Sequence, residues 1–159
     1  MKTEALMFIL KQEFPRFKVC RLKWLSPGIS AITLGHKVLV GSSWDERSDV
    51  YRYTVLRHEA VHMRQQRRLG CGLPIIGSIL FYLLYALVLP AGLSYFRYRW
   101  EREAYVESMR ANYEVRGNFD LIYYADSLSG PKYLWAWPRQ WIINYFKKQV
   151  LAVLTGKVI

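Results

Sequence analysis

The sequence is poor in cysteine. Its 159 residues include two cysteines, Cys20 and Cys71, which are too few for a disulfide framework and lack the CxxC spacing of a thiolate zinc site. We therefore expect two plain buried thiols. Near the N-terminus the apolar run from Ala5 to Leu10 is shorter than the apolar segment of a secretory signal. We expect a cytoplasmic protein, or one bound peripherally to a membrane.

Acidic residues are also scarce. Asp and Glu number 12 against 23 Lys and Arg, giving a net charge of +11, and 16% of the residues are aromatic. This combination suits an anionic partner such as a membrane surface or nucleic acid. The chain has no zinc-knuckle, RNP-like or basic-leucine-zipper pattern, and its basic residues are scattered. The sequence therefore argues against nucleic acid and favours a membrane surface or a protein assembly as partner.

Local patterns predict an α+β protein with a small antiparallel sheet. Apolar periodicity predicts a helix over 3–13, a strand within 16–25, and a hairpin of strands 29–34 and 37–43 around Gly35 and His36. No internal repeat or low-complexity tract divides the chain. We expect one domain, residues 1–159.

The period becomes helical from Asp45 onward. No Gly or Pro interrupts the chain before Gly70, so we expect one long helix, capped by Asp45 or Ser48 and ended by Gly70. Two further helices are predicted over 97–114 and 139–154.

The long helix carries two histidines one turn apart. In "HEAVH", His58 and His62 share a helix face, so both imidazoles can reach one metal ion, and Glu59 projects beside them toward a metal-bound water. The alternative is a helix with two unrelated core or surface histidines. The third histidine, His36, lies in the predicted hairpin turn, and we expect it to be exposed rather than a ligand.

A catalytic zinc site needs a third protein ligand, and the helix over 97–114 offers two glutamates. Glu101 and Glu103 point to nearly opposite sides of that helix. The side of Glu101 carries small or apolar residues such as Ala104 and Tyr105, whereas Glu103 shares its side with charged residues. We predict Glu101 as the ligand and keep Glu103 as the alternative.

These motifs resemble the gluzincin branch of zinc metallopeptidases. "HEAVHMRQQ" followed by "RYRWEREAY" is similar to small zincin-like proteins of bacteria and tailed bacteriophages, over about residues 30–113. The resemblance implies a zincin-like fold, zinc ligands His58, His62 and Glu101, and Glu59 as general base. It also implies a substrate-binding sheet edge, for which "KVLVGSS" (37–43) is our candidate, and a virion-associated location is compatible with it.

The ligand count predicts the chemistry. Three protein ligands leave one position on Zn²⁺ for a water, whose pKa falls to about 7, and Glu59 can take its proton as it attacks a peptide carbonyl of a protein or peptide substrate. The oxyanion needs a donor, for which Tyr105, Tyr53 and Arg97 are candidates. The alternative function is a catalytically silent zincin-fold protein with a structural or interaction role.

A charge-free stretch separates the two metal-binding helices. Residues 69–96 contain no charged side chain, but a single membrane crossing would leave His62 and Glu101 on opposite sides. Pro74, Gly77 and Pro90 divide the stretch, and we expect a helix over 75–89 that is either core or dips into one leaflet.

The C-terminal segment, 131–159, is rich in tryptophan. Trp135, Trp137 and Trp141 alternate with basic residues, a composition typical of an interfacial membrane anchor. Trp and Tyr are equally favoured at protein interfaces. A membrane anchor and a docking surface for a partner chain therefore both remain open.

Overall fold

The computed structural model describes residues 2–23, 25, 31–87, 94–133 and 137–155. They form two compact units, 1–80 and 81–159. The fold is α+β as predicted, with helices predominating over one small sheet. The expectation of a single domain stays a prediction, and Trp135 lies outside the described residues.

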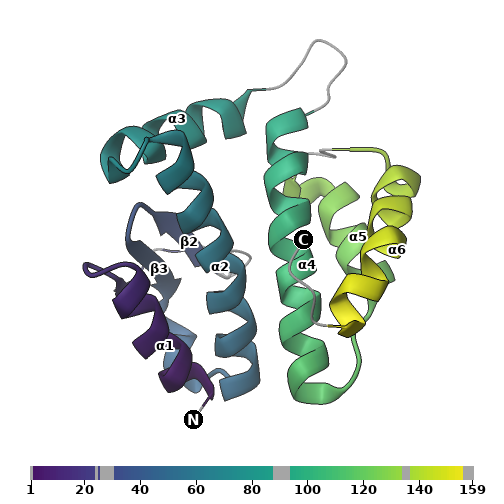
Figure 1. Cartoon of the computed structure of the whole chain (residues 1–159), viewed down its shortest axis with the longest axis horizontal. Helices are drawn as coiled ribbons and strands as arrows, with labels where there is room; N and C mark the ends of the chain where they lie inside the picture. Colours follow the sequence, from purple (N-terminus) through teal and green to yellow (C-terminus); the bar gives the residue numbers. More distant parts are fainter. Residues whose placement is uncertain (1, 24, 26–30, 88–93, 134–136, 156–159) are drawn as a thin grey trace. The chain divides into compact units, whose positions relative to one another are not determined.

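The first unit contains a helix, a three-stranded sheet and the long helix (Figure 1). In chain order its elements are α1 (Lys2–Glu13), β1 (Lys18–Leu22), β2 (Ala31–Leu34), β3 (Lys37–Gly41), the 3₁₀ turn η1 (Ser42–Glu46) and α2 (Asp49–Leu69). The predicted helix, the strand and the hairpin are confirmed, and β3 ends at Gly41 rather than at residue 43. Gly35 takes a positive φ of 59° in the two-residue turn between β2 and β3, a conformation that glycine adopts readily.

The sheet is mixed, so the prediction of an antiparallel sheet is wrong. Its strand order is β1-β3-β2; β2 pairs antiparallel with β3, whereas β1 pairs parallel with β3. Side chains alternate with period 2 in either direction, and the sequence pattern therefore could not fix the direction of β1. The candidate substrate edge is also wrong, because β3 is the central strand and both of its edges are already paired.

The long helix begins one turn later than its first candidate cap. Ser48 is the N-cap and its Oγ accepts a hydrogen bond from Tyr51 N at 3.2 Å, while Gly70 is the C-cap. Asp45 instead lies in η1, where both carboxylate oxygens accept hydrogen bonds from the guanidinium of Arg21. The helix end at Gly70 is confirmed.

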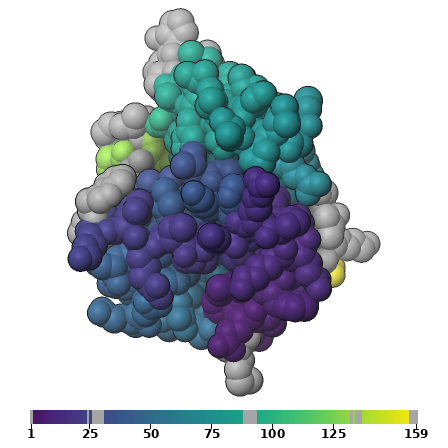
Figure 2. Space-filling view, turned by 90° about the vertical axis from the view of Figure 1, so that its left-hand side faces the viewer, coloured from purple at the N-terminus to yellow at the C-terminus, as the bar shows by residue number. Residues whose placement is uncertain are grey.

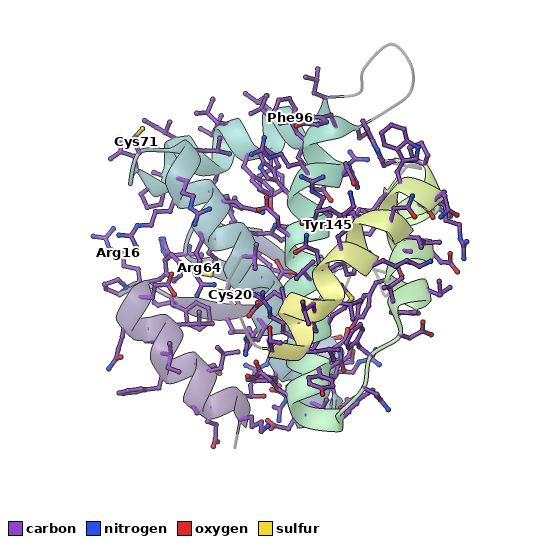
Figure 3. All side chains as sticks on the ribbon, turned by 45° about the vertical axis from the view of Figure 1, so that its right-hand side comes forward. Arg16, Cys20, Arg64, Cys71, Phe96 and Tyr145 are labelled. Carbon is purple, nitrogen blue, oxygen red and sulfur yellow. The ribbon has the colours of Figure 1, made fainter. Side chains whose placement is uncertain are left out.

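Burial of apolar side chains sets the orientation of α2. Val38 and Val40 of β3 are fully buried together with Leu10 of α1 and with Leu56 and Met63 of α2. Each such side chain contributes about 1.5–3 kcal/mol when buried. At the outer side of this core Arg64, labelled in Figure 3, makes a bidentate ion pair with Glu13 of α1.

Helix α3 (Pro74–Ala86) follows α2 after a tight turn, and the boundary between the two units falls inside it. Its first turn approaches α2 closely at Gly77. Cys71, in the turn before it, is exposed, and Cys20 is half-buried, so the prediction that both thiols are buried is wrong (Figure 3). Among the described residues no single helix is both long and apolar enough to cross a membrane; α2 and α3 meet those criteria only as a pair bent by 105°.

The second unit is helical. After the end of α3 it contains α4 (Tyr95–Arg116), α5 (Leu121–Ser129), the 3₁₀ turn η2 (Pro131–Tyr133) and α6 (Arg139–Thr155). The helices predicted over 97–114 and 139–154 are confirmed, whereas α5 was not predicted. Asp120 caps α5 by accepting from Tyr123 N at 3.0 Å, and Gly130 ends it.

The tryptophans of the C-terminal segment differ in exposure. Trp137 stacks on Tyr98 of α4 with ring centroids 4.8 Å apart and packs against the core of the second unit. Trp141 is exposed. Of the two, only Trp141 therefore presents most of its ring to solvent.

The close approach at Gly77 gives a test of the packing between α2 and α3. A Cβ at Gly77 would lie 1.9 Å from the backbone oxygen of Gln66, so Gly77→Ala should destabilise the protein by about 1–3 kcal/mol in urea unfolding. In an uncrowded helix the same change is stabilising. Gly41→Ala is the matched control, because a methyl group at Gly41 would meet nothing within 4 Å and the φ of −70° there suits alanine. A Gly77→Ala protein as stable as wild type would contradict this packing.

Candidate metal centre

The Nε2 atoms of the two histidines of α2 face each other. Nε2 of His58 and Nε2 of His62 lie 3.2 Å apart, one helical turn from each other in sequence. His62 is buried and His58 is half-buried. Two imidazole nitrogens at this distance either share a proton or direct both lone pairs to a common cation. The pair therefore has the donor chemistry and the spacing that a chelated metal ion requires.

Gln65 orients the second histidine. Its Oε1 lies 2.9 Å from Nδ1 of His62. An amide oxygen can only accept, so this contact places a proton on Nδ1 and, in the neutral imidazole, makes Nε2 the nitrogen that carries the lone pair. Sequence reasoning missed Gln65, although it follows His62 by three residues and so shares its helix face. This spacing was the available signal.

A residue of the sheet holds the side chain of Glu59 in place. The hydroxyl of Thr33 in β2 donates to Glu59 Oε2 at 2.6 Å, and both residues are buried. This bond fixes the carboxylate and leaves its second oxygen to accept a proton from another group. No spacing in the sequence links Thr33 with Glu59, which is why the sequence analysis did not find it.

The buried amide of Gln66 sets the position of Thr33. Its Nε2 donates to the backbone oxygen of Thr33 at 3.0 Å, and its Oε1 accepts from the backbone N–H of Gly35 at 2.8 Å. The same Oε1 accepts from Ser78 Oγ of α3 at 2.7 Å. The hairpin, α2 and α3 are thus joined at one side chain, which lies on α2 one helical turn after His62.

In the second unit Glu101 lies on the inner side of α4. It is buried, whereas Glu103 is partly exposed, as the facial pattern of the sequence predicts. Tyr85 donates its hydroxyl to Glu101 Oε1 at 2.8 Å. Burial, and then the charge of Glu101, raises the pKa of Tyr85 far above its usual range, so the phenol keeps its proton and stays a donor. No sequence pattern points to Tyr85, because it lies on another helix.

The guanidinium of Arg97 lies over the ring of Tyr85. The guanidinium carbon of Arg97 lies 4.7 Å from the ring centroid of Tyr85, and Arg97 Nη1 donates to the backbone oxygen of Tyr133 at 3.1 Å. The hydroxyl of Tyr105 donates to that of Tyr133 at 2.9 Å. Burial, and then the charge of Glu101, raises the pKa of Tyr105 well above its usual range, so Tyr105 also stays protonated.

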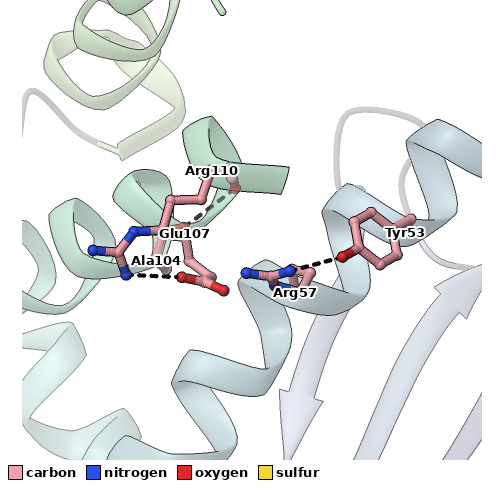
Figure 4. A network of polar contacts seen from close by, with 6 residues as sticks. Tyr53, Arg57, Ala104, Glu107 and Arg110 are labelled. Atoms are coloured by element: carbon pink, nitrogen blue, oxygen red, sulfur yellow. Dashed lines mark hydrogen bonds and ion pairs between the residues drawn. The ribbon is translucent and has the colours of Figure 1, made fainter. Parts of the chain in front are cut away.

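The remaining candidate oxyanion donor, Tyr53, is engaged within α2. Its hydroxyl accepts from Arg57 Nη1 at 2.7 Å (Figure 4). Tyr53, Arg97 and Tyr105 therefore each have a protein partner, and the oxyanion role of Tyr105 stays a prediction.

His36 occupies the hairpin turn, as predicted, but its side chain is half-buried, so the expectation that it is exposed is wrong. Its backbone oxygen accepts from Lys18 N at 3.1 Å. Burial, and then the charges of Lys37, Arg16 and Lys18, lowers the pKa of its imidazole. Its expected absence from the ligand set stays a prediction.

No protein-family model, curated protein or solved structure matches this chain. The likeness to gluzincins consequently rests on the residues of the chain itself.

The contact between Gln65 and His62 predicts a measurable effect on metal affinity. Gln65→Leu should weaken zinc binding by about 10- to 100-fold, because outer partners that orient a ligating histidine contribute this much. Affinity is measured by competition with a chromophoric chelator. Gln12→Leu, at an exposed position of α1, is the matched control and should bind zinc as wild type does. Equal affinity in both variants would exclude an orienting role for Gln65.

Proposed function

We propose that the chain is a zincin-like protein in which His58, His62 and Glu101 bind one zinc ion. The observation that carries the proposal is the facing Nε2 pair of the two histidines, with Gln65 accepting from the opposite nitrogen of His62. His58, His62 and Glu101 also form a group that could hold a metal ion. Two imidazoles and one carboxylate are a ligand set that catalytic zinc uses with its fourth position open.

Glu101 suits the third ligand position for a chemical reason. Its carboxylate is buried, and a buried carboxylate is costly unless it is paired with a cation or hydrogen-bonded. Tyr85 supplies one hydrogen bond to Oε1 and thereby orients the group. A phenol donor of this kind acts as the outer partner of a carboxylate ligand, as Gln65 does for His62.

We further propose that the protein is a zinc metallopeptidase. The bound zinc would supply Lewis-acid chemistry, acidifying water and polarising a peptide carbonyl. Glu59 would act as general base, taking the proton of the attacking water and passing it to the leaving amine. Thr33 would position Glu59 by occupying Oε2, which leaves one oxygen for the proton transfer. The substrate class that follows is a protein or peptide.

The metal assignment predicts about one zinc per purified chain. Replacing His58 and His62 together by alanine should abolish binding, measured by elemental analysis after gel filtration, because both nitrogen ligands are lost. Glu101→Gln should weaken zinc affinity much more than its matched control Glu103→Gln, since each change preserves size and removes one charge. Near-stoichiometric zinc in the double-alanine variant, or a larger loss at Glu103, would overturn the ligand set.

The peptidase assignment predicts a separate effect of Glu59. Glu59→Gln should retain zinc but lower the turnover of a fluorophore-labelled casein by about 10²- to 10⁴-fold, the usual contribution of a general base. Thr33→Val should retain zinc and lower turnover less, because it removes only the group that orients the base. A zinc-loaded wild-type protein no more active than Glu59→Gln would favour the catalytically silent alternative, in which the same ligands bind zinc without turnover.

A further inference from the structure

Helix α3 presents an aliphatic stripe to solvent. Ile75, Ile79 and Leu83 are spaced four residues apart and are 76%, 55% and 65% exposed. Side chains at this spacing lie one above another on a helix face. Ile76 and Leu80 of the same helix, and Leu87 just after its end, are exposed as well. Figure 2 shows part of the α3 surface, in teal. A contiguous apolar surface of this kind on a folded protein marks an interaction site.

The opposite face of α3 is fixed by packing, which gives the stripe a defined orientation. Gly77 lies against the backbone of Gln66, and Ser78 donates to the side chain of Gln66. Farther along, Phe81 stacks on Trp100 of α4 with ring centroids 4.3 Å apart and an interplanar angle of 15°. A rotation of α3 about its axis that buried the aliphatic stripe would break these contacts.

The segments that flank α3 in the sequence carry only positive charge. From residue 60 to residue 100 the chain has no Asp or Glu, and its charged side chains in this range are all arginines. Arg67 and Arg68 are exposed at the end of α2, immediately before the turn into α3, and Arg99 is exposed on α4. An aliphatic helix bordered in sequence by arginines alone complements a surface that is apolar inside and anionic outside.

We propose that the α3 stripe docks on an anionic lipid bilayer. Protein interfaces are typically rich in aromatic anchors with hydrogen-bonding groups around them, whereas this stripe is purely aliphatic. The acyl region of a bilayer requires only apolar area. At about 1.5 Å per residue the 13 residues of α3 are shorter than the hydrocarbon core of about 30 Å, so α3 lies in the plane of the interface. Ile75, Ile79 and Leu83 enter the acyl boundary, and Arg67 and Arg68 meet the headgroups.

The test is sedimentation of the full chain with vesicles. Wild type should bind vesicles of phosphatidylcholine containing phosphatidylglycerol, bind pure phosphatidylcholine vesicles at least tenfold more weakly, and release from the anionic vesicles as salt is raised. Binding should persist after treatment with a metal chelator, because the stripe does not involve the candidate metal ligands. This arm separates the lipid proposal from the zinc and peptidase proposals.

Two matched variants identify the surface. Ile75→Gln/Ile79→Gln/Leu83→Gln should weaken vesicle binding at least tenfold, whereas Ile122→Gln/Leu151→Gln/Leu154→Gln, at exposed positions of α5 and α6, should bind as wild type. Circular dichroism checks that each variant is folded. If the α3 triple variant is unfolded, the single change Leu83→Gln replaces it, and this change is expected to weaken vesicle binding severalfold.

Arg67→Gln/Arg68→Gln should weaken binding at low salt by about tenfold or more, because each basic residue at an anionic surface contributes about 1 kcal/mol. Lys147→Gln/Lys148→Gln, at exposed positions of α6, is its control. An α3 triple variant that binds anionic vesicles as tightly as the wild-type protein would overturn the proposal. So would a wild-type protein that ignores the vesicles but forms a dimer that the α3 triple variant abolishes, since the stripe would then be covered by a second copy.

Discussion

The buried amide of Gln66 is the constraint on which the arrangement around the histidines depends. Its two polar ends are satisfied by the backbone of Thr33, the backbone of Gly35 and the hydroxyl of Ser78. A buried amide left unpaired would cost about 1–3 kcal/mol, so the hairpin and α3 must both keep their places against α2. Thr33 is thereby brought to Glu59, and α3 is held with its aliphatic stripe outward.

Each unit supplies part of the proposed zinc site together with a side chain that orients it. In the first unit Gln65 fixes the tautomer of His62, and in the second Tyr85 holds the carboxylate of Glu101. Both partners are neutral hydrogen-bonding groups, and each fixes the direction of one side chain of the proposed zinc site. Partners of this kind commonly orient metal-binding side chains, which supports the proposed zinc site.

Helix α3 has the uncharged composition of a core helix but exposes one aliphatic face to solvent. It is uncharged, as a core helix would be, yet its small residues Gly77 and Ser78 face α2 while its largest aliphatic residues face solvent. Close packing needs small side chains at the contact, and this leaves Ile75, Ile79 and Leu83 on the other side. The exposed stripe is therefore a consequence of how α3 packs, and it gives the charge-free segment a role apart from joining α2 and α4.

The amino-acid sequence by itself determined the features that depend on local periodicity: α2 with both histidines on one face, the hairpin turn at Gly35, and the inward side of α4 that carries Glu101. It left open whether Asp45 or Ser48 caps α2, and it missed α5 despite Asp120 and Gly130 at its ends. The parallel pairing of β1, and the contacts of Thr33 and Tyr85 with the two glutamates, were decided only by the tertiary structure. Such contacts join residues far apart in the chain, and no short-range pattern records them, because they form only once the packed elements have brought their partners together.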